Sequence, residues 1–343
     1  MERRQFVKTA AISMGALASG AGLSHSAIAE TPVPGEQPAA GGRPVRVVSI
    51  GFNPGLALER ITELVDREGA AGADLIVLPE TCRGQDEQTP EPLHGPTITA
   101  IAPLAAKHKT YIVCPIDRMD GNTRYNSAVL IDRQGQVACI YDKLYPVWQA
   151  ECIQHPPVQP GSKVQVYETD FGRVGLAICF DVNWTSLWQE LANQGAELVV
   201  WPSAYSAGRS LQAQAIQYNY YIVSSTHVPD CLVYDIDGTL LVHDKQNAGP
   251  EANITRIRLD LDRCVFHQDL NLPAKRDKLL HEHADDVELE QWWPMEGWFV
   301  LRAKRPGVSA RALASQYGLE ELRHYINRSR SEIDKCRGWE FTG

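Results

Sequence analysis

The sequence lacks an apolar run long enough to cross a lipid bilayer: its longest uncharged early stretch, residues 11–23, is short and interrupted by glycine and serine. From residue 30 onward it also lacks the glycine patterns of phosphate-binding and dinucleotide-binding loops. Positive charge is in deficit, since the formal net charge is −9. An acidic chain is a poor electrostatic match for nucleic acid phosphates. These absences argue against stable membrane insertion and against nucleic acid as a partner.

The eight cysteines lack the spacing of a disulfide framework or a zinc site. No CxxC pair occurs, and the cysteines are scattered from residue 82 to residue 336. Cys114 and Cys139 lie inside apolar runs that are typical of strands. We therefore expect free buried thiols at these positions.

Residues 1–29 follow the order of a bacterial export signal. Arg3 and Arg4 precede an uncharged stretch and a small-residue cleavage pattern that ends at Ala29. The two arginines resemble a twin-arginine signal, which is an address read by a receptor and not an anchor. The alternative is a disordered basic N-terminus. We expect a periplasmic mature chain that begins with a Pro/Gly-rich linker over residues 30–44.

From residue 45 the chain alternates between short strand-like runs and helical patterns. This alternation predicts an α/β fold, and strands that are apolar on both faces predict a covered sheet. A hairpin signal, DIDG, indicates that the sheet is mixed. Strands are expected at 45–52, 73–80, 110–116, 126–132, 136–143, 173–180, 196–202, 221–226, 231–243 and 254–262, and helices at 56–70, 97–109, 184–195 and 211–220.

The pattern changes beyond residue 265, so we expect a main domain over residues 45–265 and a C-terminal extension over 266–343. The extension has a polar segment, an aromatic stretch WWPMEGWF and two short helical patterns. It is either wrapped over a partner subunit or a small appended module. Residues 307–330 also suit a helix-turn-helix. However, Leu319, Leu322, Ile326 and Ile333 form an apolar stripe, which favours packing on the main domain or a partner subunit.

Three predicted strands end in chemically reactive side chains, at the sheet edge where α/β proteins place their sites. Glu80 follows LIVLP, Lys143 follows CIYD and Cys179 follows GLAI. An acid, an amine and a thiol can together cleave a carbon-nitrogen bond through a thioester, as general base, oxyanion stabiliser and nucleophile. Each residue alone has an ordinary structural interpretation, as a surface charge or a buried thiol.

These motifs resemble those of the nitrilase, or carbon-nitrogen hydrolase, superfamily. LIVLPET matches its glutamate motif, YDKLYP its lysine motif and GLAICFD its nucleophile motif, and the resemblance runs from about residue 45 to 262. The resemblance implies a four-layer α-β-β-α sandwich with Glu80, Lys143 and Cys179 side by side. It further implies hydrolysis without cofactor or metal, and a homodimer or higher homo-oligomer.

The chain departs from the family pattern at two places. Family members usually carry a second glutamate between the lysine and the nucleophile. Glu151 is assigned to this position, although it stands farther than usual from Pro160 and Gly161. The alternative is that Glu151 is a surface acid. The stretch that commonly reads R-A-x-E-N is QAIQYN here, so its arginine and glutamate are missing. The second departure concerns support of the pocket or interface and not the chemistry.

The residues around Cys179 are expected to support it. A sharp turn into a helix would place its sulfur near helix-terminal N–H groups, which favour the thiolate. Phe180 would offer its backbone N–H to the oxyanion, and Asp181 would fix the turn through local hydrogen bonds. Candidate pocket residues are Tyr145, Trp148, Trp184, Tyr205 and Arg209.

The tripeptide CFD favours a small-molecule amide or N-carbamoyl substrate, because nitrile-cleaving relatives often carry Trp-Glu after the cysteine. Nitrile hydrolysis by the same residues and a catalytically silent binding protein remain alternatives. A metal site in HEHADD, residues 281–286, is a further one, but solvated loop residues are favoured there.

Overall fold

The computed structural model describes residues 41–227, 230–243, 247–249, 251–269 and 271–339. The predicted export signal and nearly all of the predicted linker lie outside these residues. Within them no helix is both long and apolar enough for a transmembrane span.

The first sheet has eight strands, and seven follow the order β13-β14-β1-β2-β4-β5-β6 while β3 pairs with β4. Its central pairs β1/β2 and β2/β4 are parallel, whereas β1/β14, β4/β5 and β5/β6 are antiparallel, so the sheet is mixed as predicted. The strands are β1 (Pro44–Phe52), β2 (Leu75–Val77), β3 (Glu91–Pro92), β4 (Tyr111–Asp120), β5 (Thr123–Ile131), β6 (Val137–Asp142), β13 (Asn247–Gly249) and β14 (Ala252–Asp260).

The second sheet has six strands in the order β12-β11-β10-β9-β8-β7. Its central strands β8, β9 and β10 are parallel. The strands are β7 (Gln165–Glu168), β8 (Arg173–Leu176), β9 (Leu198–Ser203), β10 (Tyr221–Thr226), β11 (Val233–Tyr234) and β12 (Leu240–Val242).

Alternation along the strands of the first sheet produces the layers of the fold. In β1, Val45 and Val47 face the second sheet, whereas Val48 and Ile50 pack with helices α1 (Leu58–Ala70) and α2 (Pro96–His108). Period-two alternation places successive side chains on opposite faces, so apolar residues at every position require cover on both sides.

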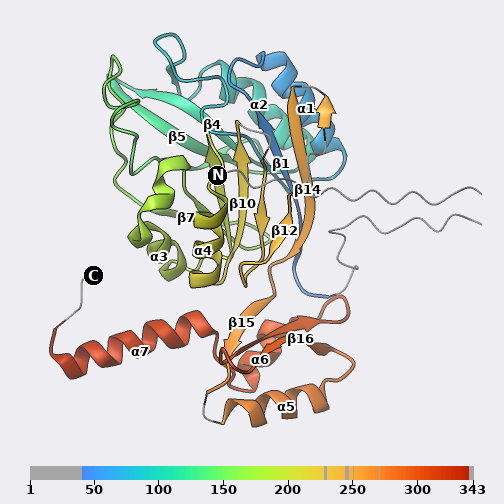
Figure 1. Cartoon of the computed structure of the whole chain (residues 1–343). Coiled ribbons are helices and arrows are strands. Elements are labelled where there is room, and N and C mark those ends of the chain that lie inside the picture. Colours follow the sequence, from blue (N-terminus) through green and yellow to red (C-terminus); the bar gives the residue numbers. More distant parts are fainter. Residues whose placement is uncertain (1–40, 228–229, 244–246, 250, 270, 340–343) are drawn as a thin grey trace, which may run out of the picture. The chain divides into compact units, whose positions relative to one another are not determined.

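The helices that follow Cys179 cover the second sheet. Helices α3 (Thr185–Asn193) and α4 (Gly208–Tyr218) bury Leu187, Leu191 and Leu211 in the same core as the second sheet. Figure 1 shows α3 and α4 on one side of the paired sheets and α1 and α2 on the other. This arrangement confirms the predicted α-β-β-α sandwich.

The C-terminal extension contains a sheet of its own, which the sequence patterns did not predict. Three strands, in the order β15-β17-β16, pack with the helices α5 and α6 around a separate apolar core. β16 escaped notice because its residues VELEQWW are mostly half-buried and show no clean apolar alternation. The elements are β15 (Cys264–His267), α5 (Leu272–Glu282), β16 (Val287–Trp293), β17 (Trp298–Ala303), α6 (Ala310–Gln316) and α7 (Leu322–Arg337).

Buried polar contacts connect this extension to the main domain. Arg311 of α6 forms an ion pair with Glu197, which also binds Arg43. Arg323 of α7 donates a hydrogen bond to the Ala196 carbonyl at 2.6 Å. The Asp262 carboxylate accepts a 2.6 Å bond from the backbone N–H at the start of α6. The two helices of the helix-turn-helix-like segment are thus engaged in intramolecular packing.

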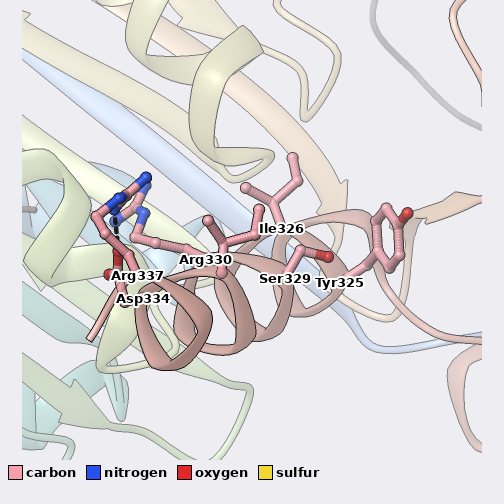
Figure 2. Close-up of a pocket in the computed structure, with 7 residues that line it drawn as sticks. Tyr325, Ile326, Ser329, Arg330, Asp334 and Arg337 are labelled. Carbon is pink, nitrogen blue, oxygen red and sulfur yellow. Dashed lines mark hydrogen bonds and ion pairs between the residues drawn. The ribbon is translucent and has the colours of Figure 1, made fainter. Parts of the chain in front are cut away.

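The apolar stripe predicted on α7 is only partly covered. Leu319 is buried and Leu322 packs against the main core, but Ile326 and Ile333 are exposed, at 39% and 54%. Ile326 and Ile333 line a groove of about 390 Å³. Figure 2 shows Ile326 on this face of α7, with the Arg337–Asp334 ion pair near one end. The stripe therefore leaves an open apolar face on the described part of the chain.

Candidate active site

Glu80, Lys143 and Cys179 meet because each follows a strand near the same edge of the sandwich. Glu80 comes three residues after β2 and Lys143 directly after β6, both in the first sheet. Cys179 comes three residues after β8 of the second sheet. All three are buried, Cys179 with 4% exposure. The two sheets thus contribute different parts of one site.

Lys143 lies between two carboxylates. Its Nζ donates hydrogen bonds to Glu80 Oε1 at 2.8 Å and to Glu151 Oε2 at 2.7 Å. Glu151 Oε2 also accepts from the Val147 backbone N–H at 2.7 Å. Glu151 is therefore a buried partner of the lysine and not a surface acid, despite its unusual distance from the Pro-Gly pair.

Asn126, which the sequence did not single out, joins the same network. Its Nδ2 donates to Glu80 Oε1 and to Glu151 Oε1, both at 2.8 Å. Asn126 begins the run NSAVLID, where the one available signal was a polar amide at the edge of an otherwise apolar strand. Its contacts span 46 and 25 residues of sequence, so its role depends on the tertiary fold.

The Glu80 carboxyl is held as a carboxylate. Burial alone would raise its pKa, but the nearby Lys143 ammonium and hydrogen bonds from Lys143, Cys179 and Asn126 outweigh burial, so the pKa lies below its ordinary value. The other carboxylate oxygen accepts a 2.8 Å bond from the Ala204 backbone N–H. His227 Nε2 lies 2.5 Å from the Glu80 carbonyl oxygen and fixes the backbone there.

Lys143 is held as an ammonium by the same partners. Burial would lower the pKa of its amine, but the carboxylates of Glu80 and Glu151 raise it above the ordinary value. With two of its three N–H groups committed to carboxylates, one N–H remains to face a third acceptor.

Cys179 occupies a strained turn. Its φ is 44°, in the left-handed region that non-glycine residues rarely adopt, and a five-residue 3₁₀ helix (Cys179–Asn183) begins at this residue. Indole N–H groups hold the turn: Trp201 donates to the Cys179 carbonyl and Trp188 to the Asp181 carbonyl, both at 3.0 Å. Neither tryptophan was predicted to serve the site.

Asp181 holds the other side of this turn. Its carboxyl accepts from the Ile178 backbone N–H at 2.8 Å, from the Tyr141 hydroxyl at 2.6 Å and from the Tyr145 backbone N–H at 3.0 Å. Burial raises the pKa of Asp181 to about 7, although these hydrogen bonds act in the opposite direction. Through Tyr141, which belongs to β6, Asp181 also joins the two sheets next to the nucleophile.

The pKa of Cys179 does not move in the direction that helix-terminal N–H groups alone would give. Burial and the adjacent Glu80 carboxylate raise the pKa of the thiol, and the Lys143 charge does not compensate. The helix after the cysteine is a single short 3₁₀ segment, so its N–H groups contribute little. The sulfur is therefore protonated at neutral pH, and a base must remove its proton during attack.

Aromatic rings line one side of the site. Tyr145 and Trp184 stack in parallel with centroids 4.0 Å apart, and Phe180 meets Trp184 edge-on at 5.0 Å. Tyr205 packs edge-on against Trp201. Burial raises the pKa of the Tyr205 hydroxyl, and the nearby Glu80 carboxylate raises it further while Lys143 lowers it. These residues form the aromatic surroundings of the nucleophile.

Two predicted pocket residues are not brought into this group. Trp148 is 65% exposed, and Arg209 is exposed near the start of α4. Within the described part of the chain, no recorded hydrogen bond, ion pair or ring contact links either side chain to the catalytic cluster. Their assignment to the pocket stays a prediction.

A family model described as carbon-nitrogen hydrolase matches residues 53–264, more than half of the chain. The chain belongs to the carbon-nitrogen hydrolase family. The matched span includes all residues of the site and ends where β15 of the C-terminal extension begins.

Curated relatives share about a quarter of their residues with this hydrolase. A nitrilase of Pyrococcus abyssi is 24% identical over 259 residues, covering 70% of this chain and 95% of its own. A deaminated glutathione amidase of Synechocystis is 29% identical over 200 residues, covering 49% and 70%. A Drosophila melanogaster fusion protein of nitrilase and fragile histidine triad is 27% identical over 190 residues, with 50% of this chain and 41% of that protein covered.

Solved structures of the nitrilase superfamily share the fold. An amidase from Nesterenkonia has a TM-score of 0.55 at 20% identity, with 69% of this chain and 97% of that chain covered. A superfamily member from Saccharomyces cerevisiae has a TM-score of 0.54 at 19% identity, with 64% and 90% covered. The part of this chain that each solved structure leaves uncovered is longer than residues 1–40, which lie outside the described residues.

Proposed function

We propose that this hydrolase cleaves a small amide or N-carbamoyl substrate through a thioester on Cys179. The observation that carries the proposal is the convergence of buried Cys179, Glu80 and Lys143, in which Lys143 donates a hydrogen bond to Glu80 at 2.8 Å. This arrangement gives a nucleophile, a base and a cation within one buried cluster.

In the first half-reaction, Glu80 takes the thiol proton while the sulfur attacks the carbonyl carbon. The remaining N–H of Lys143 and the backbone N–H of Phe180 stabilise the oxyanion. The intermediate collapses as Glu80 returns the proton to the leaving nitrogen, which departs as ammonia or an amine, and the acyl group stays on sulfur. Glu151 keeps Lys143 in position beside Glu80.

In the second half-reaction, Glu80 activates a water molecule that attacks the thioester carbon. The carbon-sulfur bond breaks, the sulfur regains a proton and the carboxylic acid leaves. In each half-reaction Glu80 first accepts a proton and then returns it to the leaving group, so one carboxylate suffices for both.

The relatives support this chemistry without fixing the substrate. They include proteins named as amidases and as nitrilases, and one solved structure is of the Nesterenkonia amidase in complex with butyramide. Nitrile hydrolysis by the same residues is therefore one outcome of the test, and a catalytically silent binding protein is another.

Ammonia release from aliphatic and aromatic amides, N-carbamoyl amino acids and nitriles tests the proposal, with butyramide in the first set. The mature chain is compared with Cys179→Ala and with Cys231→Ala, a matched loss of another buried thiol outside the cluster. We expect release from amides or N-carbamoyl compounds that Cys179→Ala abolishes and Cys231→Ala retains. Activity confined to nitriles would reassign the substrate class, and silence across the panel would favour the binding protein.

We also propose export to the periplasm as a homo-oligomer. The support is the sequence of residues 1–29 and the family resemblance. Replacement of Arg3 and Arg4 by lysine should retain the precursor in the cytoplasm, whereas the unchanged chain should be recovered from the periplasm with its N-terminus near Glu30. Light scattering on that mature chain should give at least twice the protomer mass.

A further inference from the structure

One side-chain amide holds both carboxylates of the site. Asn126 is completely buried and donates one Nδ2 hydrogen to Glu80 and the other to Glu151, each at 2.8 Å. Its backbone carbonyl accepts a 2.9 Å bond from the backbone N–H of Lys143, which fixes the two backbones side by side. The Asn126 amide therefore contacts both carboxylates that bind the Lys143 ammonium.

The orientation of this amide is determined by its donors. Asn126 Oδ1 is buried and has no hydrogen-bond partner among the described residues. A reversed amide would direct that oxygen at two carboxylates, which is unfavourable for both. The amide thus leaves one acceptor unsatisfied while it supplies two donors to negative charges.

These donors compensate for a charge imbalance. Glu80 and Glu151 carry two negative charges, and Lys143 supplies one positive charge. Two carboxylates that share a single cation in a buried site repel each other, and hydrogen-bond donors to both offset that repulsion. A hydrogen bond to an ionised carboxyl lowers its pKa, and Asn126 is one of the groups that lower the pKa of Glu80.

We infer that Asn126 is a positioning residue that holds the Glu80 carboxylate, together with Glu151, around the single ammonium of Lys143, so that Glu80 is available as the base. The inference rests on the proposed role of Glu80. Without Asn126, Glu80 loses one of its hydrogen-bond donors and takes up a proton at a higher pH. The reaction of the Cys179 sulfur then loses its base on the acidic side of neutrality.

The test follows alkylation of Cys179 by iodoacetamide as a function of pH, located by peptide mass spectrometry. Asn126→Ala is compared with the unchanged protein and with Ser127→Ala. Ser127 is equally buried on the same strand, but it bonds Asp142 and Arg118 and none of the catalytic groups. Asn126→Asp, which has the same shape, replaces the donors by an acid and serves if the alanine variant does not fold.

We expect the acidic midpoint of the alkylation profile to rise by about one pH unit in Asn126→Ala, a tenfold loss of rate below both midpoints. At pH 9 the rate should return to within about threefold of the unchanged protein, because both carboxylates are then ionised. Asn126→Asp should shift the midpoint further, and Ser127→Ala should leave it in place. An unshifted midpoint in both Asn126 variants would overturn the inference.

Alkylation requires no turnover, so the two proposals fail separately. A substrate panel without activity, together with a shifted alkylation midpoint, would contradict the proposed function and support the role of Asn126. Normal turnover with an unshifted midpoint would contradict only the role of Asn126. A Cys179 that is unreactive at every pH in the unchanged protein would contradict both.

Discussion

The two sheets build their halves of the site by different means. The first sheet presents Glu80 and Lys143, and Lys143 donates charge-assisted hydrogen bonds to both Glu80 and Glu151. The second sheet presents Cys179 on a strained turn. The neutral indole N–H groups of Trp201 and Trp188 hold this turn by hydrogen bonds to the carbonyls of Cys179 and Asp181. One half depends on protonation state and the other on backbone shape.

This difference predicts two kinds of damage. Changes in the charged half should alter the pH dependence of the reaction, because they change which groups are ionised. Loss of an indole donor from the turn should lower the rate at every pH, because it displaces the sulfur without altering the base. The predictions below separate these two effects.

The largest effect should come from the sulfur itself. Cys179→Ala should lower kcat by at least roughly 10⁴-fold, because no other group can form the covalent intermediate. Its thermal unfolding should remain cooperative, since a methyl group fits where the thiol was. Ammonia release with the best substrate of the panel measures the loss, and retained turnover would contradict the account.

Removal of the base should have the next largest effect. Glu80→Gln keeps the shape but cannot accept a proton, so kcat/KM should fall by about 10²–10⁴-fold. The pH profile of the unchanged protein should have an acidic limb, and this limb should be absent from the profile of the variant. Because the folded pKa of Glu80 is lowered, activity in the unchanged protein should be lost only as the pH falls below the ordinary glutamate range. A variant that keeps the acidic limb would assign the base to another group.

Loss of a donor from the turn should have a moderate effect. Trp201→Phe keeps a ring but removes the N–H that bonds the Cys179 carbonyl at 3.0 Å. We expect a fall in kcat of roughly tenfold with unchanged pH midpoints, and destabilisation of about 1–3 kcal/mol. Steady-state kinetics across pH and chemical denaturation measure these. A shifted midpoint would show that the turn also controls protonation.

The smallest effect on activity should come from the contact with the C-terminal extension. Glu197→Gln disrupts the ion pairs of this residue with Arg43 and Arg311. Because neither ion pair includes a residue of the active site, kcat should change by less than about twofold. Thermal unfolding should occur at a lower temperature. A large loss of kcat would show that the extension supports the site.

The same change has a defined pH dependence. Although burial opposes it, hydrogen bonds and ion pairs with arginines lower the pKa of Glu197. The carboxylate therefore stabilises the fold fully above its unfolded pKa, and this contribution is lost as the pH falls through the folded value. The stability difference between the unchanged protein and Glu197→Gln should shrink on acidification below about pH 4.5. A difference that grows there would reverse the assignment.

The sequence predicted the parts of the site that depend on local pattern. Glu80, Lys143 and Cys179 each end an apolar strand, so strand assignment and chemistry together identified them. Asn126 and Trp201 act through contacts with residues far away along the chain, which local pattern does not reveal. The pKa of Cys179 runs against the thiolate expectation because local sequence does not show the burial of the sulfur or its distance from Glu80.

The same distinction holds for the fold. Strands of the sandwich are apolar on both faces and were recognised from composition, whereas β16 of the extension carries alternating acids and half-buried residues. Ile326 and Ile333 were predicted to pack on the main domain or on a partner subunit, and they are exposed in the single chain, because helical spacing shows that a face is apolar but not what covers it. Coverage is a property of the assembled fold.

Capture of the covalent intermediate tests the central claim most directly. A turning-over mixture with the best substrate is quenched in acid, and the intact mass and the modified peptide are determined. The account predicts an acyl adduct of the substrate on Cys179, accumulating within the first turnover and absent from Cys179→Ala. Turnover with no adduct on this residue, or with the adduct on another cysteine, would contradict it.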